Sequence, residues 1–250
     1  MAQPIYNLHN HTPFSDGAYT IDELCEAHLA CDTVKFDGVG ISDHLFCTPS
    51  SREIQSERQF ERTFGNETRD YVEAVHAARR RWAGRLRVFC GCEVNWPLNK
   101  NNLGMIRTML NGIDYVLFEY VDWAGLTQLA NQARRWPCPV GLSHVDVTRA
   151  FPNTSMDQVV RTMANARIFY EVNVSLMPLS DHDQWFNIVP NHRVAVAIGT
   201  DTHDDLGCIA HVAEIVRYLA EKGLAEKYLQ PRVRAEEAER AAVPQSASSR

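Results

Sequence analysis

The sequence lacks any long hydrophobic run, which excludes the common kind of membrane-spanning helix. No stretch approaches the roughly 18 uninterrupted apolar residues that such a helix needs. The first residues also lack the charged and then apolar pattern of a secretory signal. We therefore expect a cytoplasmic protein without a membrane partner.

Positive charge is not in excess either. The chain has 25 Lys and Arg residues against 31 Asp and Glu residues, and its formal net charge is −6. Proteins that follow a nucleic-acid backbone usually carry a basic surface, because phosphate contacts dominate their affinity. The charge balance therefore disfavours nucleic acid as a partner, and the composition carries no signal for an oligomeric state.

Cysteine pairs with the spacing of a zinc ribbon or a disulfide framework are missing as well. The seven cysteines are an odd number spread through apolar segments: Cys25, Cys31, Cys47, Cys90, Cys92, Cys138 and Cys208. This distribution is typical of reduced, buried thiols. No GxSxG motif occurs, so the sequence offers no serine nucleophile of the elbow type.

What the chain does contain is a regular alternation of two kinds of segment. Short apolar runs rich in β-formers occur at 5–8, 37–41, 87–91, 115–118, 140–143, 168–174 and 194–199. Helical patterns lie between most of them, some with capping signals, at 20–32, 54–83, 124–136, 155–166 and 209–222. This alternation predicts an α/β fold with parallel strands, and seven units are enough to close a barrel.

The domain organisation follows from composition. Residues 1–230 read as one barrel domain, since α/β barrels of this length commonly form a single unit. Residues 231–250 are charged and then small and polar, without an apolar face wide enough to dock. We expect this tail to be largely disordered.

Ionisable side chains follow every predicted strand. The stretch "HNHTPFSDG" places His9 and His11 one residue apart, so that on a strand both rings would project to the same side. The ends of the other strands carry Asp43 and His44, Glu93, Glu119, His144 and Asp146, Glu171 and Asn173, and Asp201 and His203. Because the carboxyl ends of parallel strands converge, this mixture of imidazoles and carboxylates predicts a multi-metal site.

The same motifs resemble those of a known family. "HNHTPFSDG", "GVGISDH", "GCEVN", "LSHVD" and "GTDTHD" occur in the order, and near the spacings, of the PHP (polymerase and histidinol phosphatase) family. The resemblance covers about residues 5–205. It implies a distorted (β/α)7 barrel with two or three divalent metal ions (Mn, Zn or Fe), in which a metal-bound hydroxide hydrolyses a phosphoester.

The resemblance also implies a distribution of ligands. A first metal would take His9, His11, Glu93 and Asp201, with Glu93 bridging to a second metal that is also bound by His144. A third position would take Asp16, His44 and His203. The family commonly has a histidine soon after "DYV", and this chain has none there, so Glu119 is the nearest replacement as a ligand of the second metal, with Asp122 next.

Other residues are candidates for catalysis and substrate binding. Asp43 could orient a ligand or relay a proton, and Asp146 and His182 could protonate the leaving group. The cations best placed for the phosphate are Arg149, Lys100 and Arg52. The polar stretch 46–70, with Phe60 and Phe64, is expected to form a lid over a small substrate.

The leading prediction is therefore a metal-dependent phosphomonoesterase acting on a sugar, amino-alcohol or nucleotide phosphate. Alternatives are a phosphodiesterase or nuclease, a metal-binding barrel without catalysis, and a metal-dependent C–N hydrolase. The acidic charge disfavours the nuclease. The clustered ionisable groups disfavour a barrel without metal, and no strand end carries the lysine that a carbamylated bridge needs.

Overall fold

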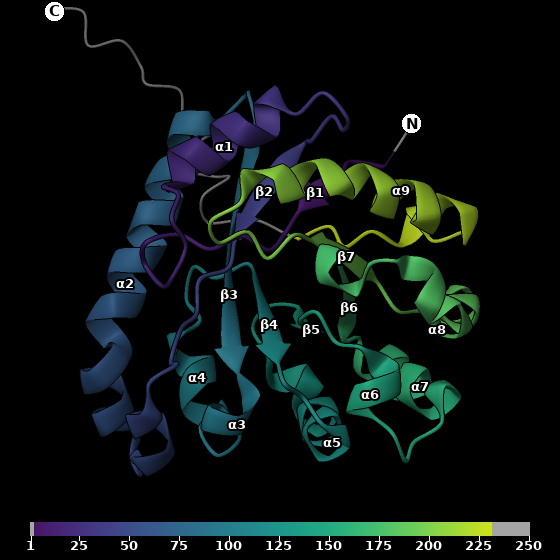
Figure 1. Ribbon diagram of the computed structural model, residues 1–250. Helices are drawn as coiled ribbons and strands as arrows, with labels where there is room; N and C mark the ends of the chain where they lie inside the picture. Colours follow the sequence, from purple (N-terminus) through teal and green to yellow (C-terminus); the bar gives the residue numbers. More distant parts are fainter. Residues whose placement is uncertain (1–2, 232–250) are drawn as a thin grey trace, which may run out of the picture.

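The computed structural model describes residues 3–231, which form a closed barrel of parallel strands in chain order (Figure 1). The strands are β1 (Tyr6–Asn7), β2 (Gly38–Ile41), β3 (Arg87–Asn95), β4 (Tyr115–Glu119), β5 (Val140–Leu142), β6 (Phe169–Asn173) and β7 (Val196–Gly199). Each overlaps one of the apolar runs, so the predicted α/β barrel is confirmed. The expected tail lies outside the described residues except for Pro231.

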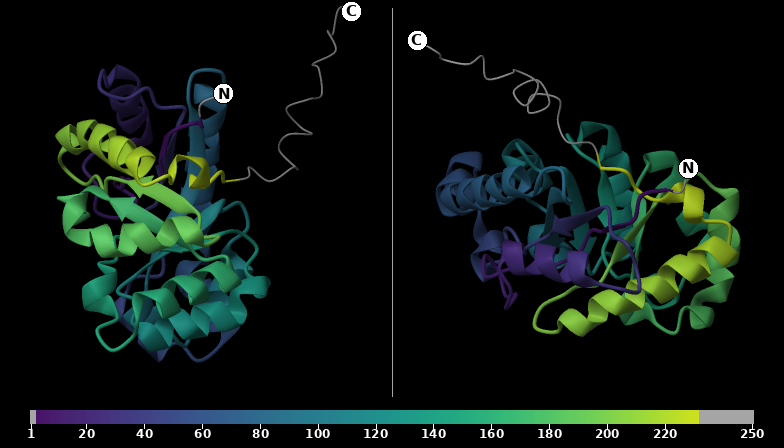
Figure 2. Two further views of the ribbon diagram at one scale, coloured as in Figure 1. Left: turned by 90° about the vertical axis from the view of Figure 1, so that its right-hand side faces the viewer. Right: turned by 90° about the horizontal axis from the view of Figure 1, so that it is seen from above.

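Helices surround the barrel, with the long α2 along one side and α9 running across the upper part of the view in Figure 1 (Figures 1 and 2). The α-helices are α1 (Ile21–Ala30), α2 (Glu57–Trp82), α3 (Trp96–Asn99), α4 (Leu103–Met109), α5 (Trp123–Gln132), α6 (Val147–Ala150), α7 (Met156–Ala166), α8 (Asp183–Ile188) and α9 (Val212–Glu221). Short 3₁₀ turns occur at Pro49–Glu53, Ala133–Arg135, Val174–Leu176, Leu179–His182, Val189–Asn191, Leu206–His211 and Ala225–Lys227.

The predicted capping signals form as hydrogen bonds. Thr20 accepts a bond from the backbone N–H of Glu23, and the Glu23 carboxylate accepts one from the backbone N–H of Thr20 at 2.8 Å. Ser155 caps α7 by accepting from the N–H of Gln158. Each bond satisfies a donor that the first turn of a helix leaves without a partner, which fixes where α1 and α7 begin.

Aromatic side chains fill the inside of the barrel. Tyr115 and Phe169 are fully buried there, and their rings lie against Gly91 and Gly141. A Cβ atom at either glycine would come within 2.3 Å of the facing ring, so only glycine fits. The Tyr115 hydroxyl donates to the Leu8 carbonyl at 2.6 Å. The filled interior leaves the mouth of the barrel as the place for a ligand.

The expectation of a lid at 46–70 is wrong for its aromatic residues. Phe60 and Phe64 lie in the first turns of α2 and are only 1% exposed. Their ring centroids lie 5.2 and 5.4 Å from that of Phe46, which follows β2. Burying these three rings stabilises the segment as part of the core. Ser56 accepts a bond from the N–H of Gln59 and caps α2, which begins at Glu57.

The barrel closes between its first and last strands through few contacts. Asn7 and Ile198 are the paired residues of β1 and β7, and the Leu8 N–H donates to the Ile198 carbonyl at 2.7 Å. Beyond the strands, the N–H of Asp201 donates to the carbonyl of His9 at 2.9 Å. The predicted metal ligands of the first and last strand are therefore neighbours along this seam.

Two further expectations concern cysteine and membranes. All seven cysteines are free, with Cys25, Cys90 and Cys92 buried and the others partly exposed. Among the described residues, no helix is both long and apolar enough to cross a bilayer.

Candidate metal centre

Four predicted ligands from three parts of the chain meet at the mouth of the barrel. Although β1 ends two residues before His9, the Nε2 atoms of His9 and His11 lie 3.0 Å apart, and both rings are buried. Asp201 Oδ1 lies 3.2 and 3.1 Å from these nitrogens. Glu93 Oε2, from within β3, lies 3.5 and 3.6 Å from them.

These spacings suit ligands of one cation. Bonds of about 2.1 Å at octahedral or tetrahedral angles put neighbouring ligand atoms roughly 3.0–3.5 Å apart. Two imidazole nitrogens at 3.0 Å cannot both carry protons, and a cation between them would bind the lone pairs of both. His9, His11, Glu93 and Asp201 thus form a donor group that fits the first metal position.

A second donor group contains Glu93, Glu119 and His144. His144 Nε2 lies 3.1 Å from Glu93 Oε1, while the other Glu93 oxygen faces the first group. Glu119 is the last residue of β4, and its carboxylate accepts a hydrogen bond from Asn95 at 2.9 Å. Glu93 is thus placed to bridge two cations, and Glu119 lies where the family's histidine is missing.

A third donor group contains His11, Asp16, His44 and His203. The two Asp16 oxygens lie 3.6 Å from His44 Nε2 and 3.3 Å from His203 Nε2. The three groups together contain every ligand that the resemblance assigns. Asp122, the next choice for the second metal, belongs to none of them and instead caps α5 by accepting from the N–H of Gly125. A fourth group, His44, Cys47 and Glu119, was not predicted.

The electrostatics of the cluster favour bound positive charge. Burial disfavours the charged form of His9, but Glu171 and Glu93 outweigh it and raise the pKa of His9 well above its usual value. Burial also disfavours a charged Glu93, yet His9 and His144 hold its pKa well below its usual range. Burial and then the Glu93 charge raise the pKa of Glu119. Several buried carboxylates therefore share the positive charge of a few imidazoles, and a bound cation would stabilise them further.

Unpaired buried atoms provide a direct test of whether metal fits. His44 Nδ1, Glu93 Oε2 and Asp201 Oδ1 are buried without a hydrogen-bond partner. Such atoms are costly to leave unsatisfied. All three belong to the donor groups, and nitrogen and carboxylate oxygen are the ligands that zinc, manganese and iron accept. The residues present therefore fit divalent cations.

Backbone strain is concentrated at the same strand ends. His144 (φ 33°), Asp201 (φ 53°) and Tyr120 (φ 55°) all adopt left-handed backbone conformations. These conformations are unfavourable for residues with a side chain and persist where surrounding contacts hold them. Here they follow β5, β7 and β4 at the mouth of the barrel.

Glu171 and Ser143 contact the ligands and were not assigned a role from the sequence. Glu171 is fully buried, and its Oε1 lies 2.8 Å from His9 Nδ1. Its Oε2 accepts from the N–H of His144 at 2.7 Å, and Ser143 donates to Glu93 Oε1. The position of Glu171 near the end of β6 could have indicated a role at the centre, because every other strand end carries a candidate ligand.

Asp43 lies behind the loop that carries His11. Its oxygens accept from the N–H and hydroxyl of Thr12, both at 2.7 Å, and from the Ser15 hydroxyl at 2.6 Å. Ser15 Oγ in turn lies 3.3 Å from His11 Nδ1. Asp43 thus holds the loop and is linked to the His11 ring through Ser15.

A small cavity adjoins the second donor group. Its volume is 370 Å³, and its lining includes Tyr120, His144, Asp146 and Arg149. Arg149 Nε lies 3.2 Å from Asp146 Oδ2, and His182 Nδ1 lies 3.8 Å from Asp146 Oδ1. Three of the predicted catalytic and substrate-binding residues therefore meet beside the donor groups.

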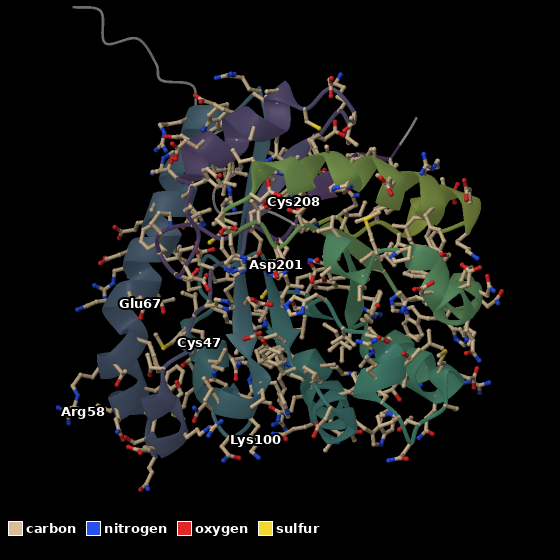
Figure 3. The ribbon with its side chains drawn as sticks, in the orientation of Figure 1. Cys47, Arg58, Glu67, Lys100, Asp201 and Cys208 are labelled. Carbon is tan, nitrogen blue, oxygen red and sulfur yellow. The ribbon has the colours of Figure 1, made fainter. Side chains whose placement is uncertain are left out.

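The other two predicted cations lie elsewhere. Lys100 and Arg52 are exposed, and neither lines this cavity. Figure 3 shows Lys100 at the lower edge of the molecule, well away from Asp201. Proximity in sequence to Glu93 and His44 did not bring these side chains to the centre, because α3 and the Pro49–Glu53 turn lead the chain outward.

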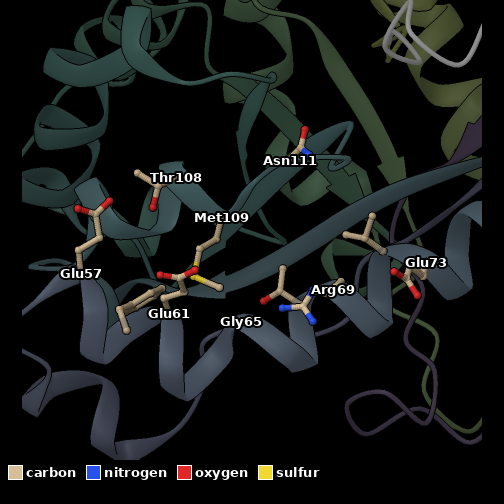
Figure 4. A pocket seen from close by; sticks show the side chains of 11 residues that line it. Glu57, Glu61, Gly65, Arg69, Glu73, Thr108, Met109 and Asn111 are labelled. Atoms are coloured by element: carbon tan, nitrogen blue, oxygen red, sulfur yellow. The ribbon is translucent and has the colours of Figure 1, made fainter.

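A larger groove lies on the outside of the barrel, between α2 and α4 (Figure 4). Its volume is 640 Å³, and its lining includes Glu61, Arg69, Glu73, Thr108 and Asn111. None of its lining residues belongs to a donor group. The donor groups are therefore at the mouth of the barrel and not in this groove.

Fold and site together define a parallel α/β barrel whose mouth carries groups of histidines and carboxylates that fit metal ions. A search against protein families matches the PHP domain over residues 7–230. The chain belongs to the PHP domain family, as the sequence motifs indicated. No curated protein sequence matches the chain significantly.

Solved structures share the fold at low sequence identity. A histidinol phosphate phosphatase from Lactococcus lactis subsp. lactis Il1403, complexed with zinc, L-histidinol and phosphate, is similar with a TM-score of 0.54 and 13% identity. The match covers 86% of this chain and 93% of that chain. A chain in an archaeal ribonuclease P with mature tRNA matches with a TM-score of 0.52, 11% identity, and coverage of 88% and 86%.

Proposed function

We propose that this protein is a metal-dependent phosphoesterase that hydrolyses a small phosphomonoester. The observation that carries the proposal is the meeting of His9, His11, Glu93 and Asp201 with two adjoining donor groups that share Glu93 or His11. Two or three divalent ions fit these groups. When bound, they would neutralise phosphoryl oxygens and lower the pKa of a water molecule that attacks phosphorus.

The chain's own residues have distinct tasks in this reaction. Glu93 holds the first two donor groups at a fixed separation, because one oxygen faces His9 and His11 and the other faces His144. Manganese, zinc and iron are all compatible with mixed imidazole and carboxylate ligands. Glu119 in place of an imidazole favours manganese or iron at the second position.

The cavity beside His144 supports a small substrate. A volume of 370 Å³ is at the lower end of the range for small-molecule pockets, about 300–1,000 Å³. Arg149 would contact the phosphate or leaving group, and Asp146 with His182 would deliver the proton that the leaving oxygen needs. A sugar, amino-alcohol or nucleotide phosphate fits this arrangement.

A phosphodiester or nucleic-acid substrate is the second candidate. The likeness to a chain of the ribonuclease P complex motivates it, since that fold occurs in a particle with tRNA. The net charge of −6 and the exposed acidic Asp16 at the mouth favour the small substrate. A cytoplasmic location is also proposed, because seven free cysteines are typical of a reducing compartment.

The test is a substrate panel with defined metal content. Chelator-treated protein is reconstituted with Mn²⁺, Zn²⁺ or Fe²⁺ and assayed against phosphomonoesters, phosphodiesters and short RNA. We expect hydrolysis of phosphomonoesters, loss of activity with chelator, and at least two ions per chain by elemental analysis. Less than one ion per chain after reconstitution would disprove the proposal, and preference for RNA would support the second candidate.

A further inference from the structure

The donor group of His44, Cys47 and Glu119 has no counterpart in the ligand sets that the sequence predicts. One donor atom from each residue, the thiol sulfur included, lies within 4.8 Å of the others. Among the described residues, no other such group contains a cysteine. This thiol therefore lies at the edge of the metal centre without an assigned task.

The local fold brings the three side chains together. His44 and Cys47 are three residues apart in the loop after β2, and Phe46 between them has a left-handed backbone with φ 63°. The Cys47 thiol lies 3.3 Å from the Leu45 carbonyl. Glu119 reaches the group from the end of β4, two strands away.

The two ring nitrogens of His44 face different donor groups. Nε2 lies 3.6 Å from Asp16, in the third group. Nδ1 lies 3.1 Å from Glu93 and 3.9 Å from Glu119, and it is buried without a hydrogen-bond partner. A neutral imidazole has one lone pair, so His44 can serve the third group or the Cys47 group, but not both at once.

The surroundings of the thiol are negatively charged. The Cys47 sulfur lies within 4.8 Å of a Glu119 carboxylate oxygen, and Glu93 lies 3.1 Å from His44 Nδ1. A cation bound among these groups would replace the thiol proton. In Figure 3, Cys47 and Glu67 of α2 lie on the same side of the molecule.

We propose that Cys47, His44 and Glu119 form a binding position for a thiophilic divalent cation, such as Zn²⁺ or Cd²⁺. As the ion binds, the thiol proton passes to solvent and the thiolate sulfur becomes a ligand. His44 binds through Nδ1, and its Nε2 keeps a proton that faces Asp16. A thiolate is a soft ligand that binds Mn²⁺ and Mg²⁺ weakly, so this position would bind Zn²⁺ or Cd²⁺ in preference to them.

This position makes the metal content depend on which ions are offered. A thiophilic ion at Cys47 withdraws His44 from the third group and weakens binding there. A harder ion such as Mn²⁺ leaves the thiol protonated and His44 free to bind through Nε2. The proposal concerns metal binding alone, so it stands or falls separately from phosphoester hydrolysis.

The test uses Co²⁺ as a spectroscopic probe of apoprotein, since thiolate–Co²⁺ bonds give a near-ultraviolet charge-transfer band. We expect wild type to develop this band as Co²⁺ is titrated, and Cys47→Ser to lack it. Cys208→Ser is the matched control (Figure 3). Cys208 is also partly buried, and its sulfur lies 3.2 Å from the hydroxyl of Thr202, the residue after Asp201, but it belongs to no donor group among the described residues. This variant should keep the band.

A second measurement compares bound Cd²⁺ by elemental analysis. Cys47→Ser should bind about one Cd²⁺ fewer per chain than wild type, with Mn²⁺ content unchanged. Absence of the band in folded wild type, or its persistence in Cys47→Ser, overturns the proposal. If Cys47→Ser fails to fold by circular dichroism, Cys47→Ala is measured in the same way, and the wild-type band remains decisive.

Discussion

Glu171 binds His9 and His144 at the same time, one with each carboxylate oxygen. Oε1 lies 2.8 Å from His9 Nδ1, and Oε2 accepts from the N–H of His144 at 2.7 Å. A proton on His9 Nδ1 leaves its Nε2 lone pair facing His11 and Asp201, where a cation fits. Glu171 therefore fixes a ligand of the first donor group and the backbone of a ligand in the second.

Replacing this carboxylate should weaken metal binding. Glu171→Gln keeps the size but presents an amide N–H to at least one of the two donors. We expect metal affinity to fall about 10–100-fold, the usual cost of losing a group that orients a metal-bound histidine. Competition titration against a chelating dye measures this directly.

Asp114→Asn is the control for the Glu171 variant. Asp114 is also a buried carboxylate, but it binds Arg79 and the backbone N–H of Cys90, outside the donor groups. It should lose stability and keep its metal affinity. Equal loss of affinity in the two variants would mean that Glu171 acts only through general stability.

Glu93→Gln should remove activity while keeping the fold. Its Oε2 faces His9, His11 and His44, and its Oε1 accepts from Ser143 and faces His144, so no neutral side chain can replace both oxygens. We expect kcat to fall by at least about 10³-fold, or roughly 4 kcal/mol in the barrier. Steady-state kinetics with elemental analysis measure this, and near-normal turnover at full metal content would contradict the assignment.

Glu119 stands where the family commonly has a histidine ligand of the second metal. Glu119→Gln should lower occupancy there more than at the neighbouring positions, because the amide is a weaker ligand. Glu119→His should restore occupancy and shift preference towards zinc. Metal content after loading with equal Mn²⁺ and Zn²⁺ reports both effects. A metal-bound crystal structure with every ion farther than about 3 Å from the Glu119 carboxylate would contradict the role.

His28 should make the free energy of unfolding decrease as the pH falls. Burial lowers the pKa of His28 to about 4, and its Nε2 lies 2.9 Å from the Asn7 amide. The unfolded chain takes up a proton near pH 6.5, so the contribution is present above that pH and is lost as pH falls towards 4. This loss is about 3 kcal/mol. Chemical denaturation of His28→Gln should show a smaller decrease than wild type between pH 6.5 and 4.

Much of the centre could be predicted because ligands in a parallel barrel come directly after strands. His9, Glu119 and His144 each follow an apolar run. Because the ends of parallel strands converge at one mouth of the barrel, these side chains are brought together. Cys47 could not be found in this way. It lies in a loop whose course depends on the left-handed Phe46 and on the burial of that ring by α2, which local patterns do not encode.

The substrate-binding residues are harder to predict from the sequence, because their positions also depend on the course of loops. Arg149 lies beside the centre because the short α6, capped by Asp146, follows β5 after the four-residue segment 143–146 that contains His144. Lys100 follows an equally short helix, but the chain there continues outward into α4. The number of residues between a side chain and a ligand limits how far apart the two can lie. It does not determine the direction in which the chain runs.

A metal bound at the seam between β1 and β7 would also hold the barrel closed. His9 and His11 lie on one side of this seam and Asp201 lies on the other, from opposite ends of the barrel sequence. A cation shared by them would cross-link the two ends where the backbone contributes few bonds. Opening of the seam would then require ion release, so amide hydrogen exchange at Leu8, His11 and Asp201 would slow with metal more than elsewhere. Apoprotein would lose its first strand before the rest of the barrel.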